Sequence, residues 1–379
     1  MSADGHMVLY ATFNDSLVHE QKYPWYGNTL DTDDPDKTYP EIRSVRYPKP
    51  GTNNPTVALT VADIADPKHI RTRHLTPPKP ILEEGDYYFT SAQWVSLTEV
   101  CVVWLTRVQN LSVVSVCKSP MWYCQEVYRI SSGADSWVEP APTPLWSAGG
   151  GALVTLAPVR DGPAGLFRHV VRVEHNAHGP RALPLTHGSF DVVKLLAWDH
   201  GNQHIYYIGI PEGKPGQQHL YRVSSEAPKP GSPQKLPYCV TCNSQPSPGF
   251  SLEFYGSLAS GDSAWDNDWE ELPPAHQPNK KNKKKPPEPP SPNAPCLYHE
   301  AFFSASASFF VLQCLGPGAP TATLHRAALP EPRMLLHVHN NTALKERLTA
   351  IAMPRPRTFS VQLSSGHAAR VRLLLPPAL

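Results

Sequence analysis

Residues 96–104 read Ser96-Leu97-Thr98-Glu99-Val100-Cys101-Val102-Val103-Trp104, a short polar turn followed by an apolar, β-rich run. A turn that leads into such a run is typical of a buried β-strand. The same pattern returns in four other segments, residues 2–11, 147–154, 199–207 and 304–312. The chain is therefore predicted to consist of a repeated β-unit.

The spacing of these segments indicates the kind of unit. One apolar residue of each serves as an anchor, in order Val8, Val102, Val154, Ile205 and Val311. The successive intervals are 94, 52, 51 and 106 residues, and insertions account for the two long ones. A period near 50 suits four-stranded propeller blades, which run about 40–50 residues and need neighbours to cover both faces. The sequence predicts an all-β, propeller-like fold, and a β-sandwich with accidental spacing is the alternative.

The composition agrees with an all-β chain that has long loops. The 379 residues include 43 Pro and 23 Gly, which favour turns and edge segments over long helices. The formal net charge of +1 offers no field that would attract nucleic acid, so no nucleic-acid partner is expected. No apolar run reaches the ~20 residues of a membrane-spanning helix, and residues 1–6 lack the features of a signal peptide.

Cysteines and glycosylation sequons indicate an oxidising compartment. Six of the seven cysteines form local pairs, Cys117 with Cys124, Cys239 with Cys242, and Cys296 with Cys314. Disulfides persist in secreted proteins, and the sequons at Asn14, Asn110 and Asn340 point the same way. We therefore expect a signal or anchor to precede this chain in the complete protein. The remaining cysteine, Cys101, alternates with valines and is predicted to be a buried, free thiol.

Two insertions interrupt the repeat. Residues 243–295 combine acidic and aromatic residues with a lysine cluster and a proline run, which predicts a disordered Pro/Lys-rich insertion. Residues 39–64 contain several prolines and are predicted to be an extended arm that leads into a strand. The blades are accordingly placed in residues 1–242 and 296–379.

No catalytic or metal site is found in the sequence. A serine hydrolase of the α/β type needs a Gly-x-Ser-x-Gly elbow, and the nearest string, residues 261–265, lacks the second glycine. His337 and His339 share a strand period but have no third ligand. Cys239 and Cys242 have redox-pair spacing without a βαβ pattern, which favours a structural bridge. The pair Glu83-Glu84 is interpreted as solvated. No catalytic residue, metal or cofactor is predicted.

Two longer motifs resemble the dipeptidyl peptidase IV family. Tyr47-Pro48-Lys49-Pro50-Gly51-Thr52-Asn53-Asn54-Pro55-Thr56-Val57 resembles the family's Tyr-Pro-Lys-x-Gly-x-x-Asn-Pro-x arm. Trp104-Leu105-Thr106-Arg107-Val108-Gln109-Asn110-Leu111-Ser112-Val113 is similar to its Trp-Leu-x-Arg-x-Gln-Asn-x-Ser strand. Shorter similar pieces follow in the family's order, and together they cover nearly the whole chain except residues 243–295.

The resemblance implies a partial β-propeller. The family joins an eight-bladed propeller to an α/β-hydrolase domain with a Ser-Asp-His triad, and this chain resembles about the last five four-stranded blades. By this alignment Met1 falls after the family's acidic substrate clamp, and Leu379 falls at the entry to a missing hydrolase domain. The catalytic residues of the family are therefore expected outside this chain, and whether the parent is an enzyme stays open.

Three functional readings stay open. The first is the substrate-gating half of a serine-type dipeptidyl peptidase in proteolysis. The second is a non-enzymatic extracellular scaffold of a voltage-gated potassium channel complex. Residues 189–199 favour it, because they are closer to the non-peptidase members that accompany such channels. The peptidases' Trp-Val-Gly-Arg-Phe-Arg stretch is also replaced here, by Trp137-Val138-Glu139-Pro140-Ala141-Pro142. The third is an incomplete gene model without independent function.

The resemblance also implies individual sites. The family carries glycans at positions that match Asn14 and Asn110, with Asn340 a weaker candidate, and it bridges the positions of the three cysteine pairs. Its arm mediates homodimerisation, which implies a dimer contact that involves Tyr47, Pro48, Asn53 and Pro55. The implied location is the extracellular side of the plasma membrane, held by a type II anchor on a missing N-terminus, or the secreted fluid.

Overall fold

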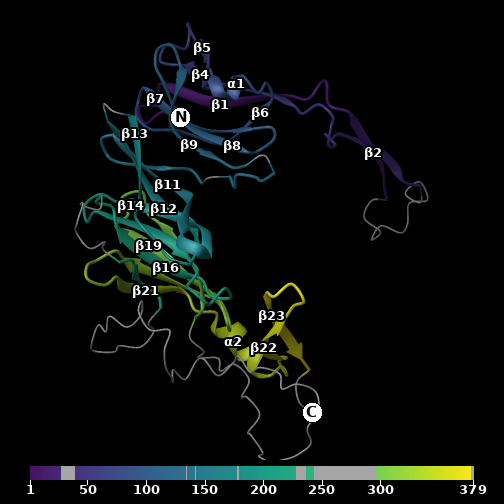
Figure 1. Ribbon diagram of the computed structural model, residues 1–379, viewed down its shortest axis with the longest axis vertical. Coiled ribbons are helices and arrows are strands. Elements are labelled where there is room, and N and C mark those ends of the chain that lie inside the picture. Colours follow the sequence, from purple (N-terminus) through teal and green to yellow (C-terminus); the bar gives the residue numbers. More distant parts are fainter. Residues whose placement is uncertain are drawn as a thin grey trace, which may run out of the picture. The chain divides into compact units, whose positions relative to one another are not determined.

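The computed structural model describes residues 1–26, 39–133, 135–140, 142–176, 179–227, 236–242 and 296–376. These residues form an all-β fold of antiparallel sheets with short helical segments (Figure 1). The chain divides into two compact units, Met1–His187 with Ser225–Pro233, and Gly188–Ser224 with Gln234–Leu379. The insertion expected at residues 243–295 lies outside the described residues.

The first unit contains three larger sheets. A three-stranded sheet consists of β1 (Met7–Asn14), β4 (Thr56–Asp63) and β5 (Arg71–His74). The next sheet has four strands, β6 (Tyr87–Trp94), β7 (Glu99–Thr106), β8 (Leu111–Lys118) and β9 (Tyr123–Ser131). The third consists of β10 (Leu145–Trp146), β11 (Ala152–Asp161), β12 (Gly165–Asn176) and β13 (Gly179–Pro184). Short helices α1 (Lys79–Leu82) and η2 (Gly162–Ala164) join strands, and β2 (Glu20–Trp25) pairs with β3 (Glu41–Arg46).

The second unit repeats the four-stranded sheet twice. One sheet consists of β14 (Val192–Asp199), β15 (His204–Gly209), β16 (His219–Ser224) and β17 (Tyr238–Cys239). The other consists of β18 (Tyr298–Phe303), β19 (Phe309–Gly316), β20 (Thr321–Arg326) and β21 (Arg333–His339). Helix α2 (Thr342–Thr349) and the hairpin of β22 (Arg355–Gln362) and β23 (Ala368–Leu375) follow.

Each four-stranded sheet is an up-and-down meander with neighbouring strands in sequence order. The anchors Val102, Val154, Ile205 and Val311 lie on β7, β11, β15 and β19, which are the second strands of their sheets. The repeated pattern therefore marks the same position in four sheets. The fifth anchor, Val8, lies on β1 of the three-stranded sheet.

The polar turn before three of the five apolar runs has the same atomic structure. The backbone N–H of Met7, Ala152 and Phe309 donates to the side-chain oxygen of the serine five residues earlier, Ser2, Ser147 and Ser304 respectively. In all three turns the fourth residue adopts positive φ, 76° at Gly5, 71° at Gly150 and 55° at Ala307. This fourth residue turns the chain by adopting the left-handed backbone conformation, in which glycine has the least strain. The repeat of the sequence is a repeat of one turn and the strand that follows it.

Strand β7 shows why these runs have apolar side chains on both faces of the strand. Its residues Val100, Val102 and Trp104 belong to one core cluster with Leu59 and Val61 of the β1–β4–β5 sheet. The intervening residues of β7, together with residues of β8, β9, β11 and β12, form a second cluster that includes Cys101, Val103, Leu153 and Val171. Because successive side chains of a strand point to opposite faces, β7 is covered by a sheet on each side. In the second unit, Tyr206 and Ile208 of β15 pack with Ala301 and Phe310 of the next sheet. Sheets that stack face to face are the arrangement of propeller blades.

Candidate functional site

The hairpin of β2 and β3 is exposed along almost its whole length. The two strands pair from Glu20 with Arg46 to Trp25 with Glu41. Every residue of β3 and all but one residue of β2 are exposed. Figure 1 shows the hairpin extending away from β1. An isolated two-stranded hairpin is marginally stable in water, and its free strand edges can pair with another chain.

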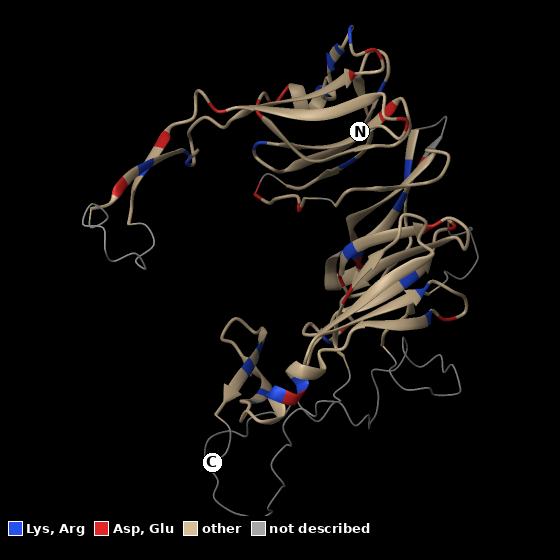
Figure 2. Ribbon diagram, turned by 180° about the vertical axis from the view of Figure 1, so that it is seen from behind, with Lys and Arg blue, Asp and Glu red and all other residues tan. Residues whose placement is uncertain are grey.

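Apolar and charged side chains are mixed on this hairpin. Its exposed apolar side chains include Tyr23, Trp25, Ile42 and Val45, and Ile42 is 68% exposed. Arg43 lies over the ring of Trp25, with its guanidinium carbon 4.4 Å from the ring centroid. Figure 2 shows acidic and basic residues alternating along the two strands. The hairpin therefore offers an amphipathic contact surface without one dominant charge.

The base of the hairpin is fixed by polar contacts. The Arg46 guanidinium donates to the carbonyl oxygens of Ser16 and Val18, at 3.2 and 2.7 Å. The Tyr47 N–H donates to the His19 carbonyl at 2.9 Å, and Val18 is buried. The exposed strands thus start from an ordered base.

The four residues expected at a dimer contact lie just after the hairpin. Tyr47 and Asn53 are exposed, whereas Pro48 and Pro55 are partly buried. The expected arm, residues 39–64, is divided by the structure, since β3 belongs to the hairpin and β4 belongs to the three-stranded sheet. Strand β2, the other half of the hairpin, has no signal in the sequence that predicts it.

The segment between β3 and β4 is held against the β6–β9 sheet. Arg107 donates to the Thr52 carbonyl and pairs with Asp86 at 2.6 Å. The Asn54 amide donates to the Tyr88 hydroxyl at 2.6 Å. An open apolar cleft of about 240 Å³ lies beside this segment, lined by Phe13, Pro55, Val57, Tyr87, Tyr88 and Phe89. These contacts fix the segment that follows the hairpin to the β6–β9 sheet.

The three sequons differ in exposure. Asn14 is exposed, and its side-chain oxygen accepts the Ser16 N–H at 3.0 Å. Asn110 is partly buried, and its side-chain oxygen accepts the Thr106 hydroxyl at 3.3 Å. Asn340 is exposed, and its oxygen accepts the Thr342 hydroxyl at 2.6 Å. Glycosylation at these positions stays a prediction.

The structure contains three disulfides, Cys117–Cys124, Cys239–Cys242 and Cys296–Cys314. These are the pairs that the sequence analysis proposes. Cys101 is free and buried, and burial raises the pKa of its thiol to about 12. A thiol with so high a pKa carries almost no thiolate at neutral pH and is therefore unreactive.

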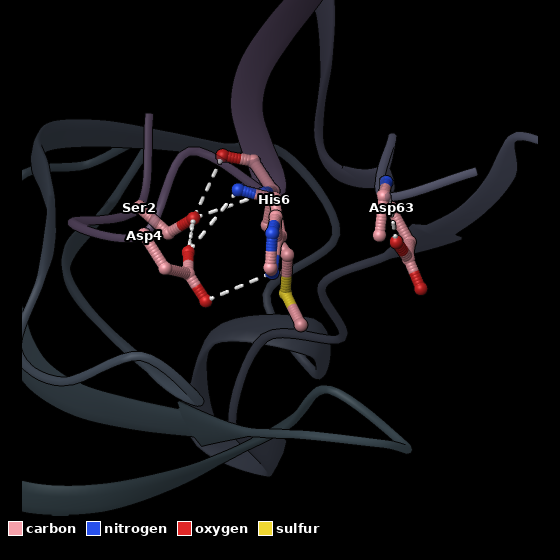
Figure 3. Close-up of polar contacts among 6 residues, drawn as sticks. Ser2, Asp4, His6 and Asp63 are labelled. Atoms are coloured by element: carbon pink, nitrogen blue, oxygen red, sulfur yellow. Dashed lines mark hydrogen bonds and ion pairs between the residues drawn. The ribbon is translucent and has the colours of Figure 1, made fainter. Parts of the chain in front are cut away.

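Ser2, Asp4 and His6 form a cluster of residue types that serine hydrolases use (Figure 3). The Ser2 hydroxyl donates to Asp4 at 2.6 Å, and the His6 ring nitrogen lies 3.4 Å from the other Asp4 oxygen. The carboxylate thus stands between the hydroxyl and the imidazole, whereas catalysis requires the imidazole to contact the hydroxyl. The hydrogen bond from Ser2 and the one from the His6 N–H lower the pKa of Asp4. In Figure 3 Asp63 lies apart from Asp4, and its oxygen accepts the Ala65 N–H at 3.1 Å. The cluster is the repeated serine turn that leads into β1.

Residues 137–142, which replace an arginine-containing stretch of the peptidases, contain the acidic residue Glu139. Trp137 is 83% exposed, whereas Val138 is buried and its N–H donates to the Gln109 carbonyl at 2.8 Å. The Glu139 carboxylate forms an ion pair with Arg168 of β12 at 2.7 Å. This chain therefore has an acid–base ion pair where the resembled stretch of the peptidases has arginines.

The other sequence candidates are placed as follows. His337 and His339 lie on β21, which is exposed along its whole length, and His339 contacts Asn341 at 2.6 Å. Glu83 and Glu84 are exposed, and Glu83 pairs with Lys79 at 3.5 Å. Residues 261–265 lie outside the described residues. Within the described part of the chain, no helix is long and apolar enough to cross a membrane.

Comparisons with known proteins agree on one family. The model of the dipeptidyl peptidase IV (DPP IV) N-terminal region matches residues 1–262. The chain is 28% identical to inactive dipeptidyl peptidase 10 of Mus musculus over 92% of its length and 35% of that protein. It is 27% identical to venom dipeptidyl peptidase 4 of Apis mellifera over its whole length and 41% of that protein.

A solved structure shows the same fold. Dipeptidyl peptidase 4 of Porphyromonas gingivalis superposes with a TM-score of 0.66 over 99% of this chain and 41% of that chain, at 18% identity. The chain thus spans well under half the length of the relatives that it matches. The repeated four-stranded sheets and the family match over more than half of the residues lead to one conclusion: this chain belongs to the dipeptidyl peptidase IV family and corresponds to its N-terminal propeller region.

Proposed function

We propose that this chain is the non-catalytic binding region of an extracellular DPP IV family glycoprotein, and that two copies assemble through the β2–β3 hairpin in the complete protein. The hairpin carries the proposal. It consists of two strands with exposed aromatic and aliphatic side chains, and in the described residues no third strand pairs with it. The three disulfides support an oxidising location, which we propose to be the outer face of the plasma membrane or the secreted fluid.

A second copy of the chain is the partner that fits the hairpin's charges. Acidic Glu20 and Glu41 and basic Lys22, Arg43 and Arg46 lie within the same two short strands. Glu20 pairs with Arg46 at 3.8 Å and Glu41 with Arg43 at 3.5 Å, so the hairpin has little unpaired charge that would repel its own copy about a twofold axis. The aromatic side chains would supply the buried centre of such an interface.

Introducing negative charges at apolar positions of the hairpin tests this assembly. The double change Ile42→Asp and Val45→Asp places carboxylates where apolar contact is expected, so it should shift a dimer to a monomer in sedimentation velocity. Leu166→Asp on β12 is the matched control, since Leu166 is equally an exposed apolar residue of the first unit, 59% exposed. A dimer that survives the double change, or that is lost equally in the control, would contradict the proposal.

The ion pair of Glu139 with Arg168 favours a non-enzymatic parent. Similarity to proteins named inactive dipeptidyl peptidase 10 supports the same choice. On this reading the complete protein is an extracellular scaffold, and the sequence of residues 189–199 suggests a voltage-gated potassium channel complex as its partner. The second candidate is the substrate-gating part of a serine dipeptidyl peptidase, which the similarity to venom dipeptidyl peptidase 4 favours.

The native protein separates these two candidates. An antibody against this chain would capture the protein from its source, and a fluorophosphonate probe would label any activated serine. We expect no labelling, no release of Xaa-Pro dipeptides and co-purification of channel subunits. Labelling together with dipeptide release would contradict the scaffold hypothesis and show that the protein is a peptidase.

A further inference from the structure

One histidine and two cysteines converge at the edge of the β14–β17 sheet. One ring nitrogen of His219 and the sulfur atoms of Cys239 and Cys242 lie within 4.8 Å of one another. Strand pairing causes this, because the register of β16 and β17 places Tyr221 opposite Cys239, and the Val240 N–H donates to the Leu220 carbonyl at 2.8 Å. Within the described part of the chain, this is the one group of three such residues that could hold a metal ion.

The imidazole of His219 is oriented toward the cysteine turn. Its Nδ1 lies 3.2 Å from the hydroxyl of Thr241, which stands between the two cysteines in sequence. Its Nε2 lies 3.2 Å from the side-chain oxygen of Gln217. A carbonyl oxygen only accepts, so Nε2 carries the hydrogen and Nδ1 presents its lone pair to the turn. A fixed partner on the far nitrogen is the usual support of a metal-binding histidine.

A second buried histidine lies beside His219, with the ring centroid of His299 5.2 Å from that of His219. The Tyr221 hydroxyl lies 3.5 Å from Cys242 Sγ, within the distance at which it can donate to a sulfur anion.

The Cys239–Cys242 disulfide is accessible, and its two sulfur atoms lie in one group with a ring nitrogen of His219. Both of its cysteines are partly exposed, whereas Cys117 and Cys124 are buried. The Cys296–Cys314 disulfide is partly exposed but contributes to no group of metal-binding residues in the described chain. Reduction of Cys239–Cys242 would thus create a donor set that the other two disulfides cannot provide.

We propose that reduction of the Cys239–Cys242 disulfide opens a site for Zn²⁺, formed by two thiolates and His219. A dithiol reductant supplies two electrons and two protons, its own sulfurs become a disulfide, and the Cys239–Cys242 bond becomes two thiols. Zn²⁺ then displaces the two thiol protons, forms two bonds to sulfur and accepts the Nδ1 lone pair. A water completes the tetrahedron, the coordination typical of a Cys₂His zinc site.

The Cα atoms of the two cysteines are 5.6 Å apart. Two thiolates on one tetrahedral Zn²⁺ lie about 3.8 Å apart, given Zn–S bonds of about 2.3 Å. Rotation of the side chains can provide this separation. The disulfide and the metal site are therefore two states of the same turn.

Cobalt titration of the full chain tests the site. The chain is reduced with a phosphine, which does not compete for metal as dithiols do, and Co²⁺ is added without oxygen. We expect one equivalent to produce thiolate-to-cobalt charge transfer and the visible bands of tetrahedral Co²⁺. Cys239→Ser and Cys242→Ser should each abolish the charge-transfer intensity at this site, and His219→Gln should weaken binding more than about tenfold.

Two control variants exclude other donors. Cys296→Ser with Cys314→Ser removes the other accessible disulfide, and His337→Gln with His339→Gln removes the exposed histidine pair; both should leave the titration unchanged. A reduced wild-type chain without the cobalt bands, an unreduced chain with the same bands, or unchanged affinity in His219→Gln would each overturn the proposal.

Alkylation of the wild-type chain provides a test that needs no variant to fold. Zn²⁺ should slow iodoacetamide labelling of reduced Cys239 and Cys242 and leave the labelling of reduced Cys296 and Cys314 unchanged. Equal labelling of Cys239 and Cys242 with and without Zn²⁺ would contradict the site.

Discussion

A serine and a residue with positive φ define the turn that repeats along this chain. The serine oxygen accepts the N–H five residues ahead, and the fourth residue of the turn is Gly5, Gly150 or Ala307. The turn lies directly before β1, β11 and β19, so its recurrence marks where these three strands begin. The resulting prediction concerns backbone conformation alone, since an added Cβ at Gly150 would meet only one side-chain atom, at 4.0 Å.

Gly150→Ala should destabilise the fold by about 1–2 kcal/mol, because an L-residue is strained at positive φ. Ala307→Gly should be neutral or stabilise by up to about 1 kcal/mol, since glycine relieves that strain at an entropic cost. Gly151→Ala is the matched control, as Gly151 has no positive φ and no atom within 4 Å of the added Cβ. Chemical denaturation measures all three. A Gly150→Ala variant as stable as Gly151→Ala would show that the turn does not need this conformation.

His325 predicts an acid dependence of stability in the second unit. Burial lowers its pKa below the ordinary histidine value of about 6.5, and its ring stacks on the buried Phe310 with the ring centroids 5.0 Å apart. The unfolded chain binds a proton at higher pH than the folded chain, so the stability from neutral His325 is complete above about pH 6.5 and is lost as pH falls.

His325→Gln should therefore reduce the loss of thermal stability between about pH 7 and pH 5. His337→Gln, an exposed change on neighbouring β21, should leave that loss unchanged. If both variants show the pH dependence of the wild type, burial of His325 does not contribute to it.

At the scale of elements, the inner strands were predictable from sequence and the hairpin was not. Strand β7 is covered on both faces, so it reads as a continuous apolar run that stands out in the sequence. Strand β2 is covered on neither face, and its sequence Glu20-Gln21-Lys22-Tyr23-Pro24-Trp25 has no burial pattern to detect. Only its pairing with β3 reveals the projecting hairpin.

The sequence also could not predict that His219 lies close to Cys239 and Cys242. The two cysteines were visible as a spaced pair, but His219 approaches them through the pairing of β16 with β17, which connects residues about twenty positions apart. The local disulfide pairs, in contrast, depend on short separations that the sequence displays directly.

The Cys296–Cys314 disulfide should stabilise the sheet of β18 and β19. It closes a loop with a sequence separation of 18. Replacing both cysteines by serine should cost about 3 kcal/mol in the chain-entropy model. Cys101→Val is a control that removes a buried thiol of similar size without removing a bridge, and it should cost less than about 1.5 kcal/mol. Denaturation under non-reducing conditions compares them, and equal losses would rule out a specific contribution of the bridge.

At the scale of the whole molecule, the sequons and disulfides predict passage through the secretory pathway. Expression in eukaryotic cells behind a heterologous signal should yield N-glycans at Asn14 and Asn110, with Asn340 a third acceptor. Enzymatic removal of N-glycans should then lower the mass of the secreted chain. Ser16→Ala and Ser112→Ala should each remove one glycan. If the mass of the secreted chain does not change on this treatment, the prediction of N-glycosylation is wrong.

Burial should set the order of hydrogen exchange along the repeats. Strands β7, β11 and β15 contain runs of buried residues, whereas β2, β3 and β21 are exposed almost throughout. Amide exchange follows local opening, which is rarest in covered strands. Protection should therefore be highest in strands with long buried runs, such as β7, β8 and β15, and lowest in the hairpin.

The same measurement at two protein concentrations tests the central claim, that this propeller region binds a second copy through the β2–β3 hairpin. In dilute solution the backbone N–H groups of β2 and β3 should exchange fast, and at high concentration they should become protected, whereas the exchange of β21, equally exposed, should not change. If the N–H groups of the hairpin exchange at the same rate at both concentrations, in a chain shown to associate at the higher one, the hairpin is not the contact between the two copies.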